Sequence, residues 1–172
     1  MARGSVKENK NIYQTTRESL GLTREKASEV LGCLTPDRIE KIESEKIPPH
    51  PEDILSMANG YKAPNLCNHY CSTQCPIGKQ YVPEIKIKNL AQIVLEMLAS
   101  LNSMNKQKER LIEIASDGEV DDEEIEDFIY IQEELEKISM TAETLRLWSE
   151  KMLATGAIDI GKYQELKEKH LK

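Results

Sequence analysis

Apolar positions in the first sixty residues recur at helical spacing, in short runs separated by residues that end helices. The pattern predicts four helices, over 11–20, 24–31, 36–44 and 51–60. Thr23 and Thr35 are good N-caps, because a threonine hydroxyl can accept a hydrogen bond from the first turn, and Gly32 suits a helix end. We expect the four helices to share one core. Its expected members are Leu20, Ala27, Val30, Leu31, Ile39, Ile42 and Leu55.

Residues 61–83 change character, because prolines interrupt them and three of the four cysteines lie there. Prolines without apolar periodicity are typical of connecting segments. We therefore expect a compact, Cys-rich linker with no more than one or two helical turns.

From Glu84 onward the apolar pattern predicts two long helices and a short last one over 159–171. The first stripe comprises Leu90, Val94, Met97, Leu101, Met104, Leu111 and Ala115. The second comprises Ile125, Phe128, Gln132, Leu135, Ile138, Ala142, Leu145 and Trp148. Neither stripe can be buried alone, so the helices should form an antiparallel hairpin or pair with another chain. The predicted fold is all-α, in three parts: 1–64, 65–83 and an oligomerisation domain at 84–172.

Composition agrees with helices and limits the partners. Aromatic residues make up only 5% of the chain, fewer than strand-rich domains carry. The net charge of −7 is uneven, with +1 over residues 1–83 and −8 over 84–172. Nucleic acid should therefore meet the first half only. With neither a membrane-spanning stretch nor a signal-peptide pattern, we expect a cytoplasmic protein with reduced thiols.

The segment from Leu22 to Lys46 carries a recognisable order of elements. Leu22-Thr23 opens a helix, Ala27 and the Leu31-Gly32 turn follow, and then comes an Ile39-x-x-Ile42-Glu43 pattern. A proline-containing loop and another helix complete the series. This order resembles the helix-turn-helix transcriptional regulators typified by the phage lambda and Cro repressors. The resemblance covers roughly residues 11–64 and implies a DNA-binding domain over 1–64, and a regulator that acts as a homodimer on double-stranded DNA.

In such a domain the helix that begins after Thr35 enters the major groove with its N-terminal end. Thr35, Asp37, Arg38 and Lys41 would then face outward. Arg38 and Lys41 are three residues apart and share a helix face, and arginine can contact guanine through two hydrogen bonds. Thr23, Arg24 and Lys46 would contact phosphates.

The cysteines form a second pattern, Cys67-x3-Cys71-x3-Cys75, followed by proline. Thiolates bind zinc or an iron–sulfur cluster, so the three are candidate metal ligands. A closed site needs a fourth ligand, and the candidates are Cys33, His50 and His69. In a straight helix, Cys67 and Cys75 would lie about 12 Å apart, so one zinc site requires the backbone to fold back. Buried structural thiols and a thiol redox switch stay open as alternatives.

The acidic residues favour a second function. Asp37, Glu40, Glu43 and Glu45 lie on the helix expected to contact DNA and would oppose phosphate. The alternative is a protein-interaction adaptor with a helix-turn-helix scaffold and an acidic hairpin, and a small metalloprotein is a third. A calcium loop at Gly118 is disfavoured because Ala115 would fill a ligand position. No catalytic constellation is present in the sequence, so we do not expect an enzyme.

Overall fold

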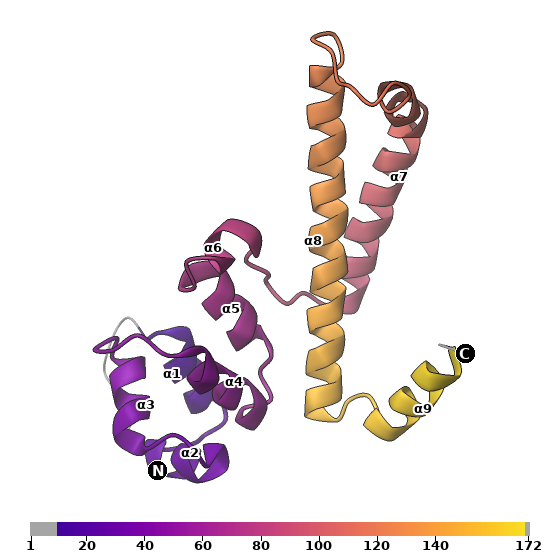
Figure 1. Cartoon of the computed structure of the whole chain (residues 1–172). Coiled ribbons are helices and arrows are strands. Elements are labelled where there is room, and N and C mark those ends of the chain that lie inside the picture. Colours follow the sequence, from indigo (N-terminus) through magenta and orange to yellow (C-terminus); the bar gives the residue numbers. More distant parts are fainter. Residues whose placement is uncertain (1–9, 171–172) are drawn as a thin grey trace. The chain divides into compact units, whose positions relative to one another are not determined.

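A computed structural model describes residues 10–170, and within that range it contains helices and no strand (Figure 1). The all-α prediction is confirmed. The chain divides into two compact units. The first comprises 1–84 together with 150–172, and the second comprises 85–149.

The four short helices of the first unit match the sequence pattern closely. They are α1 (Ile12–Ser19), α2 (Arg24–Leu31), α3 (Pro36–Glu43) and α4 (Pro51–Gly60). The hydroxyl of Thr23 accepts from the N–H of Lys26 at 3.3 Å, and Thr35 caps α3 in the same way. Gly32 ends α2 with φ of 71°, a left-handed conformation that glycine adopts without strain. Local capping chemistry therefore fixes where these helices begin and end.

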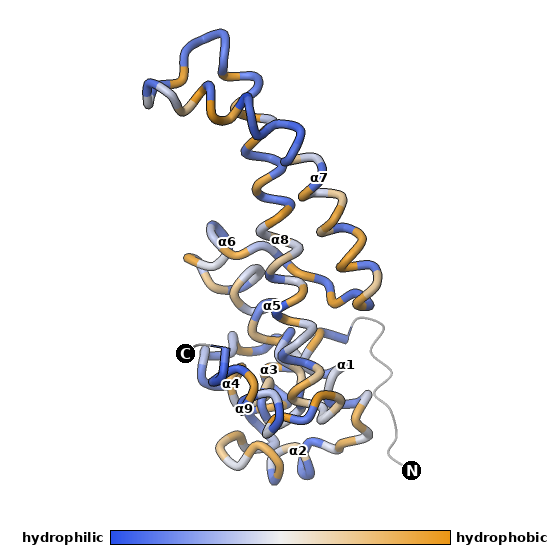
Figure 2. Tube along the Cα trace, turned by 90° about the vertical axis from the view of Figure 1, so that its right-hand side faces the viewer, coloured by the Kyte–Doolittle hydropathy of each residue, from blue (hydrophilic) through white to orange (hydrophobic). Residues whose placement is uncertain are grey.

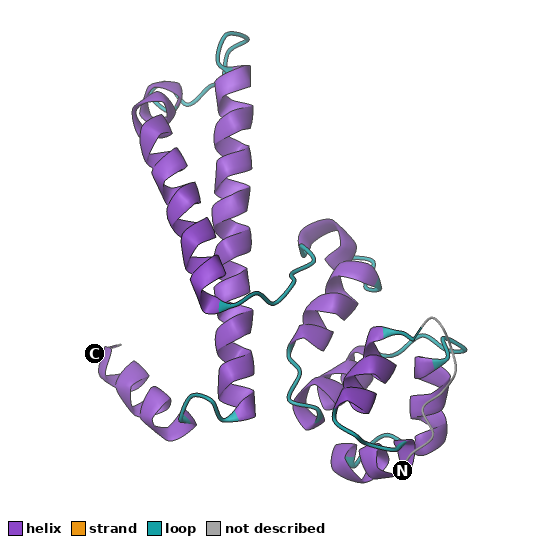
Figure 3. Ribbon diagram, turned by 180° about the vertical axis from the view of Figure 1, so that it is seen from behind, coloured by secondary structure: helices purple, strands orange, loops and turns teal. Residues whose placement is uncertain are grey.

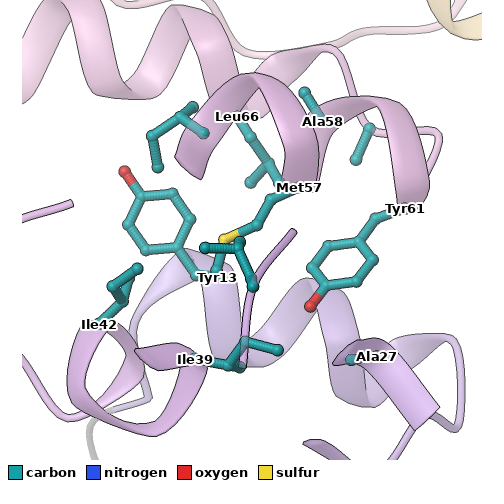
Figure 4. Close-up of a cluster of buried hydrophobic side chains, with 11 residues drawn as sticks. Tyr13, Ala27, Ile39, Ile42, Met57, Ala58, Tyr61 and Leu66 are labelled. Atoms are coloured by element: carbon teal, nitrogen blue, oxygen red, sulfur yellow. The ribbon is translucent and has the colours of Figure 1, made fainter. Parts of the chain in front are cut away.

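The core of the first unit is only partly the predicted one. Ala27, Ile39 and Ile42 are buried as expected, as Figure 4 shows. The prediction that Leu20, Val30 and Leu55 belong to the core is wrong, because these side chains are 49%, 52% and 54% exposed. Leu20 is the C-cap residue of α1 and lies beyond its last turn, whereas Leu55 lies off the face of α4 that carries Ile54 and Met57. The buried residues that replace them are Tyr13, Leu34, Ile54, Met57, Ala58, Tyr61, Ala63 and Leu66.

Residues 61–83 are more helical than expected and belong to the first unit. They form α5 (Asn65–Thr73) and α6 (Gly78–Tyr81). Leu66 is fully buried in the same core as α1 to α4, and Cys67 and Tyr70 pack against that core. The spacing of Leu66 and Tyr70 gives α5 an apolar face that α4 covers. The boundary predicted at 64/65 and the linker over 65–83 were therefore wrong.

The second unit is built by α7 (Leu90–Ile114) and the greater part of α8 (Ile125–Thr155), which run antiparallel side by side (Figures 1 and 3). Ser103 and Tyr130 share a hydrogen bond of 3.2 Å, and Arg110 donates to Asp127 at 2.6 Å. Residues 150–155 of α8 and α9 (Ile160–His170) group with the first unit, so 84–172 is not a single domain.

The covered positions of α7 and α8 agree with the predicted stripes only in part. The predicted members that are partly buried are Met97, Met104, Leu111, Phe128, Ile138, Leu145 and Trp148. On α7 the buried residues are Ile93, Ser100 and Ile114. On α8 they are Ile131, Glu134, Thr141, Thr144 and Leu147. Val94, Leu101 and Leu135 from the predicted stripes are 41%, 46% and 46% exposed. Within residues 10–170, no helix is both long and apolar enough to cross a bilayer.

Candidate nucleic-acid interface

The segment predicted to enter DNA is α3, which packs on α2 and α1. Ile39 and Ile42 hold its inner side, at 0% and 1% exposure. Thr35 and Asp37 lie exposed at its N-terminal end, and Arg38 and Lys41 are partly exposed. The four predicted contact residues of this helix therefore lie at or near the surface of the first unit.

Arg38 is held by a carboxylate from α4. Its Nη2 donates to Oδ2 of Asp53 at 2.5 Å, and its Nε donates to Oδ1 at 3.4 Å. Asp53 also accepts from the backbone N–H of His50 at 2.8 Å, which caps α4. Burial raises the pKa of Asp53, but the hydrogen bonds from Arg38 and His50 outweigh it and leave that pKa below its ordinary value. Arg38 is thus oriented by α4 and is less free than the sequence indicated.

Lys41 and Lys46 are each paired at the surface. The Nζ of Lys41 lies 2.7 Å from Asp37, with both side chains well exposed at 44% and 72%. The Nζ of Lys46 lies 2.9 Å from Glu40. Exposed ion pairs of this kind are weak, because water screens them and both side chains lose freedom. These two cations are therefore available to a competing anion at small cost.

Arg24 belongs to a cluster that the sequence analysis missed. Its Nε donates to Oε2 of Glu43 at 2.8 Å. Arg17 donates to both oxygens of the same carboxylate, and its Nη1 donates to the carbonyl of Leu22. The Glu43 side chain is only 1% exposed. We expected Glu43 to oppose DNA, but it lies inside the protein and ties α1, α2 and α3 together.

A signal for this cluster was present in the sequence. Glu43 follows Ile39 by four residues and Ile42 by one, so it continues the inward face of α3. A carboxylate at an inward position needs a cation, and Arg17 occupies a similar position on α1. Only the identity of the partner required the structure.

The remaining predicted DNA contact is Thr23. Its hydroxyl is used to cap α2, so it reaches a phosphate only by sharing that bond. The N-terminal N–H groups of α2 and α3 lie beside these caps, and helix N-termini attract anions.

The predicted metal ligands are not brought together. Cys67 and Cys71 lie one turn apart on α5, and Cys75 follows the helix end. Cys33 is exposed between α2 and α3, where its thiol donates to Ser56 at 3.0 Å. Among residues 10–170, no group of three His, Cys, Asp or Glu side chains is arranged to hold a metal ion. The described residues therefore do not form a ligand set for the predicted zinc or iron–sulfur site.

The other candidate ligands are engaged elsewhere. His50 is the N-cap residue of α4. The ring of His69 lies edge-on to Tyr13, with centroids 6.1 Å apart, and its Nδ1 is 4.0 Å from Glu84. Burial raises the pKa of the Cys67 thiol, and the neighbouring Cys71 raises it further. A raised pKa keeps the thiol protonated at neutral pH, which favours the structural role among the open alternatives.

Comparison of the chain with models of known families, with curated proteins and with solved structures found no match. The likeness to lambda and Cro repressors is therefore a prediction from the residues of 11–64.

Proposed function

We propose that this protein is a sequence-specific DNA-binding transcriptional regulator, that it works in the cytoplasm as a dimer, and that α3 enters the major groove. The observation that carries the proposal is the α2–α3 pair. Two eight-residue helices are joined by a turn at a left-handed Gly32, each with a threonine N-cap, around Ala27 and Ile39. A helix held from behind in this way can present its N-terminal end to base edges.

Lys41 is the cation that we expect to matter most for affinity. Its partner Asp37 lies on the same exposed helix, so the pair can open without disturbing the core. When a lysine neutralises a DNA phosphate, the counterions condensed there are released. The free energy gained by this release exceeds that of a screened surface ion pair. Lys46 fits the same role because its partner Glu40 is also at the surface.

Arg38 has a different role in this proposal. Asp53 fixes the plane of its guanidinium, and a fixed guanidinium loses less freedom on binding a base. Arg38 therefore reads a guanine, while Lys41 and Lys46 supply affinity to any sequence.

The test is binding of the full chain to a pool of random duplexes, followed by titration of the selected duplex at several salt concentrations. Lys41→Ala should weaken binding on all sequences and lower the salt slope by about 1. Arg38→Ala should cost about 1–3 kcal/mol on the selected site and relax its preference at one base pair. Lys79→Ala on α6 is the matched control, since Lys79 is exposed and lies outside the α2–α3 pair.

Two results would contradict the proposal. One is a chain that selects no duplex from the pool even at low salt. The other is binding that Lys41→Ala and Lys79→Ala weaken equally, since the contact would then be a diffuse attraction with no defined surface.

A protein-interaction adaptor is the second candidate, and the ion pairs favour it. Arg24, Arg38, Lys41 and Lys46 each have a carboxylate partner. This pairing lowers the positive potential that a DNA surface needs. If the chain does not bind DNA but does bind a protein partner through its acidic second half, that result would support the adaptor function.

A further inference from the structure

Helix α7 carries two heptad stripes, and only one of them is covered. The covered stripe is Ile93, Met97, Ser100, Met104, Gln107, Leu111 and Ile114, all buried or partly buried. Moving each position by one residue gives the second stripe. It comprises Val94, Leu98, Leu101, Asn105, Lys108, Ile112 and Ala115, all exposed. One residue turns a helix by about 100°, so the second stripe faces a direction of its own.

Helix α8 repeats this arrangement. Its covered positions at alternating three- and four-residue spacing are Ile131, Glu134, Ile138, Thr141, Leu145 and Trp148. The positions one residue later are Gln132, Leu135, Ser139, Ala142, Arg146 and Ser149, of which all but Ser149 are exposed. Because α7 and α8 run antiparallel, a one-residue step rotates both stripes toward the same side of the pair (Figures 1 and 3). The two outer stripes therefore form one continuous surface, which we name the outer face.

The outer face contains no acidic residue, although the second unit around it is acidic. Its polar members are Asn105, Lys108, Gln132, Ser139, Arg146 and Ser149. Its large apolar side chains are well exposed, with Leu98 at 51%, Leu101 at 46%, Ile112 at 59% and Leu135 at 46%. Figure 2 shows the apolar positions recurring along α7. Carboxylates gather instead in the 115–124 connection between the helices.

We propose that the outer face binds the outer face of a second copy of this chain, to form a four-helix bundle. In such a bundle each helix contacts two neighbours through stripes about 90° apart, which is the arrangement on α7. Two copies pair without carboxylate repulsion only through a surface free of acids. The outer face carries two basic residues, Lys108 and Arg146, and Arg146 is paired with Glu143, so the surface is a poor match for nucleic acid.

The length of the outer face supports this choice of partner. Val94 to Ala115 span about 31 Å of helix, from 1.5 Å of rise per residue. The 11-residue α9 is too short to cover it. Among the described helices only α7 and α8 of another copy have the required length. Asn105 lies midway along the stripe, where a buried amide can fix the register of the pair.

This inference concerns the dimer of the proposed function and does not depend on DNA. The test is sedimentation of the full chain over a range of concentrations. Wild type should sediment at twice the 19.6 kDa of one chain. Leu98→Glu with Leu135→Glu should raise the dimer dissociation constant by roughly 100-fold or more, because four carboxylates would enter the contact.

The matched controls are Ala99→Glu with Met140→Glu. These residues lie on the same two helices and are exposed, but each is one residue before a covered position, Ser100 or Thr141, and so lies on the opposite side of the helix pair from the outer face. The control variant should remain dimeric. A monomeric wild type would overturn the inference, and so would equal dissociation of the control.

If the glutamate variants lose their helical circular dichroism, Asn105→Leu tests the outer-face contact instead. Replacing an interfacial amide by leucine should tighten the dimer or raise the oligomer order. An unchanged association constant would then overturn the inference. A dimer that binds no DNA would leave the outer face standing and refute the proposed function alone.

Discussion

Arg17 of α1 and Glu43 of α3 form a two-point ion pair inside the first unit, with 2.6 Å from Nε to Oε1 and 2.9 Å from Nη2 to Oε2. The side chains are 7% and 1% exposed. Arg24 gives the same carboxylate a third hydrogen bond. Three helices therefore depend on one carboxylate, and the position of α3 depends on it too.

Removing that carboxylate should be costly, because two guanidinium groups would lose their counter-charge and one of them is buried. We expect Glu43→Ala to lower the free energy of unfolding by about 3–5 kcal/mol, measured by urea denaturation. Replacing both partners, as Arg17→Met with Glu43→Leu, should cost less than the single change because no buried charge is left alone. The control is Glu40→Ala, which removes a surface pair with Lys46 and should change stability little. Equal effects of Glu43→Ala and Glu40→Ala would refute this account.

Acid should weaken the contact between α3 and α4 through Asp53. Its pKa lies below the ordinary 3.8 in the folded protein, so the carboxylate stabilises the fold above that pH. The contribution is lost as pH falls through the lowered pKa. Asp53→Asn should be less stable than wild type at neutral pH, and the gap should close in strong acid. Unfolding curves from neutral pH to below 3.8 test this, and a gap of constant size would contradict it.

High pH should lower the stability of the first unit through the ionisation of Tyr61. Burial raises the pKa of this phenol to about 12, and Glu43 raises it while Arg17 lowers it. Its hydroxyl has no hydrogen-bond partner among the described residues. A raised pKa means that stability is intact below pH 10 and falls as pH rises toward 12, because only the unfolded phenol ionises readily.

Tyr61→Phe should therefore keep or raise the melting temperature at neutral pH and reduce the loss of stability above pH 10. Tyr163→Phe on α9 is the control, since Tyr163 is 38% exposed. A marked loss of stability at neutral pH in Tyr61→Phe would show that the hydroxyl has a partner after all.

Gly78 permits α6 to approach α5, and a side chain there should separate them. A Cβ at this position would lie 2.6 Å from the carbonyl carbon of Cys71, a backbone atom that cannot rotate away. Gly78→Ala should thus expose Cys71 and Cys75 to faster thiol labelling, followed by mass spectrometry. Gly161→Ala is the control, because its nearest neighbour would be 3.5 Å away. Labelling rates that stay at the wild-type level would show that α6 can shift without exposing the thiols.

Local signals explain why the sequence located α1 to α4 so well. Threonine caps, first-turn prolines and a terminal glycine act within one helical turn, so they can be identified in the sequence without the fold. The choice of buried face is a different problem. Leu55 and Ile54 are adjacent and equally apolar, yet only Ile54 is buried, because the neighbouring helices select the face.

In the candidate site, too, the local features could be predicted from the sequence, whereas the contacts between helices could not. The sequence identified Lys41 and Arg38 as surface cations of α3. It could not identify Asp53 as the partner of Arg38, because the two lie 15 residues apart and meet only when α4 folds back. The cysteine spacing indicated ligands, but α5 is a regular helix that carries its thiols along its length.

The covered stripe of the second unit includes Ser100, Glu134 and Thr141, whose burial yields little hydrophobic stabilisation. In the proposed dimer, contacts through the outer face add to the stability of α7 and α8. Their melting should then depend on concentration: diluting the protein should lower the temperature at which α7 and α8 lose helicity, whereas the midpoint for the compact bundle around Ile39 should not depend on how much protein is present.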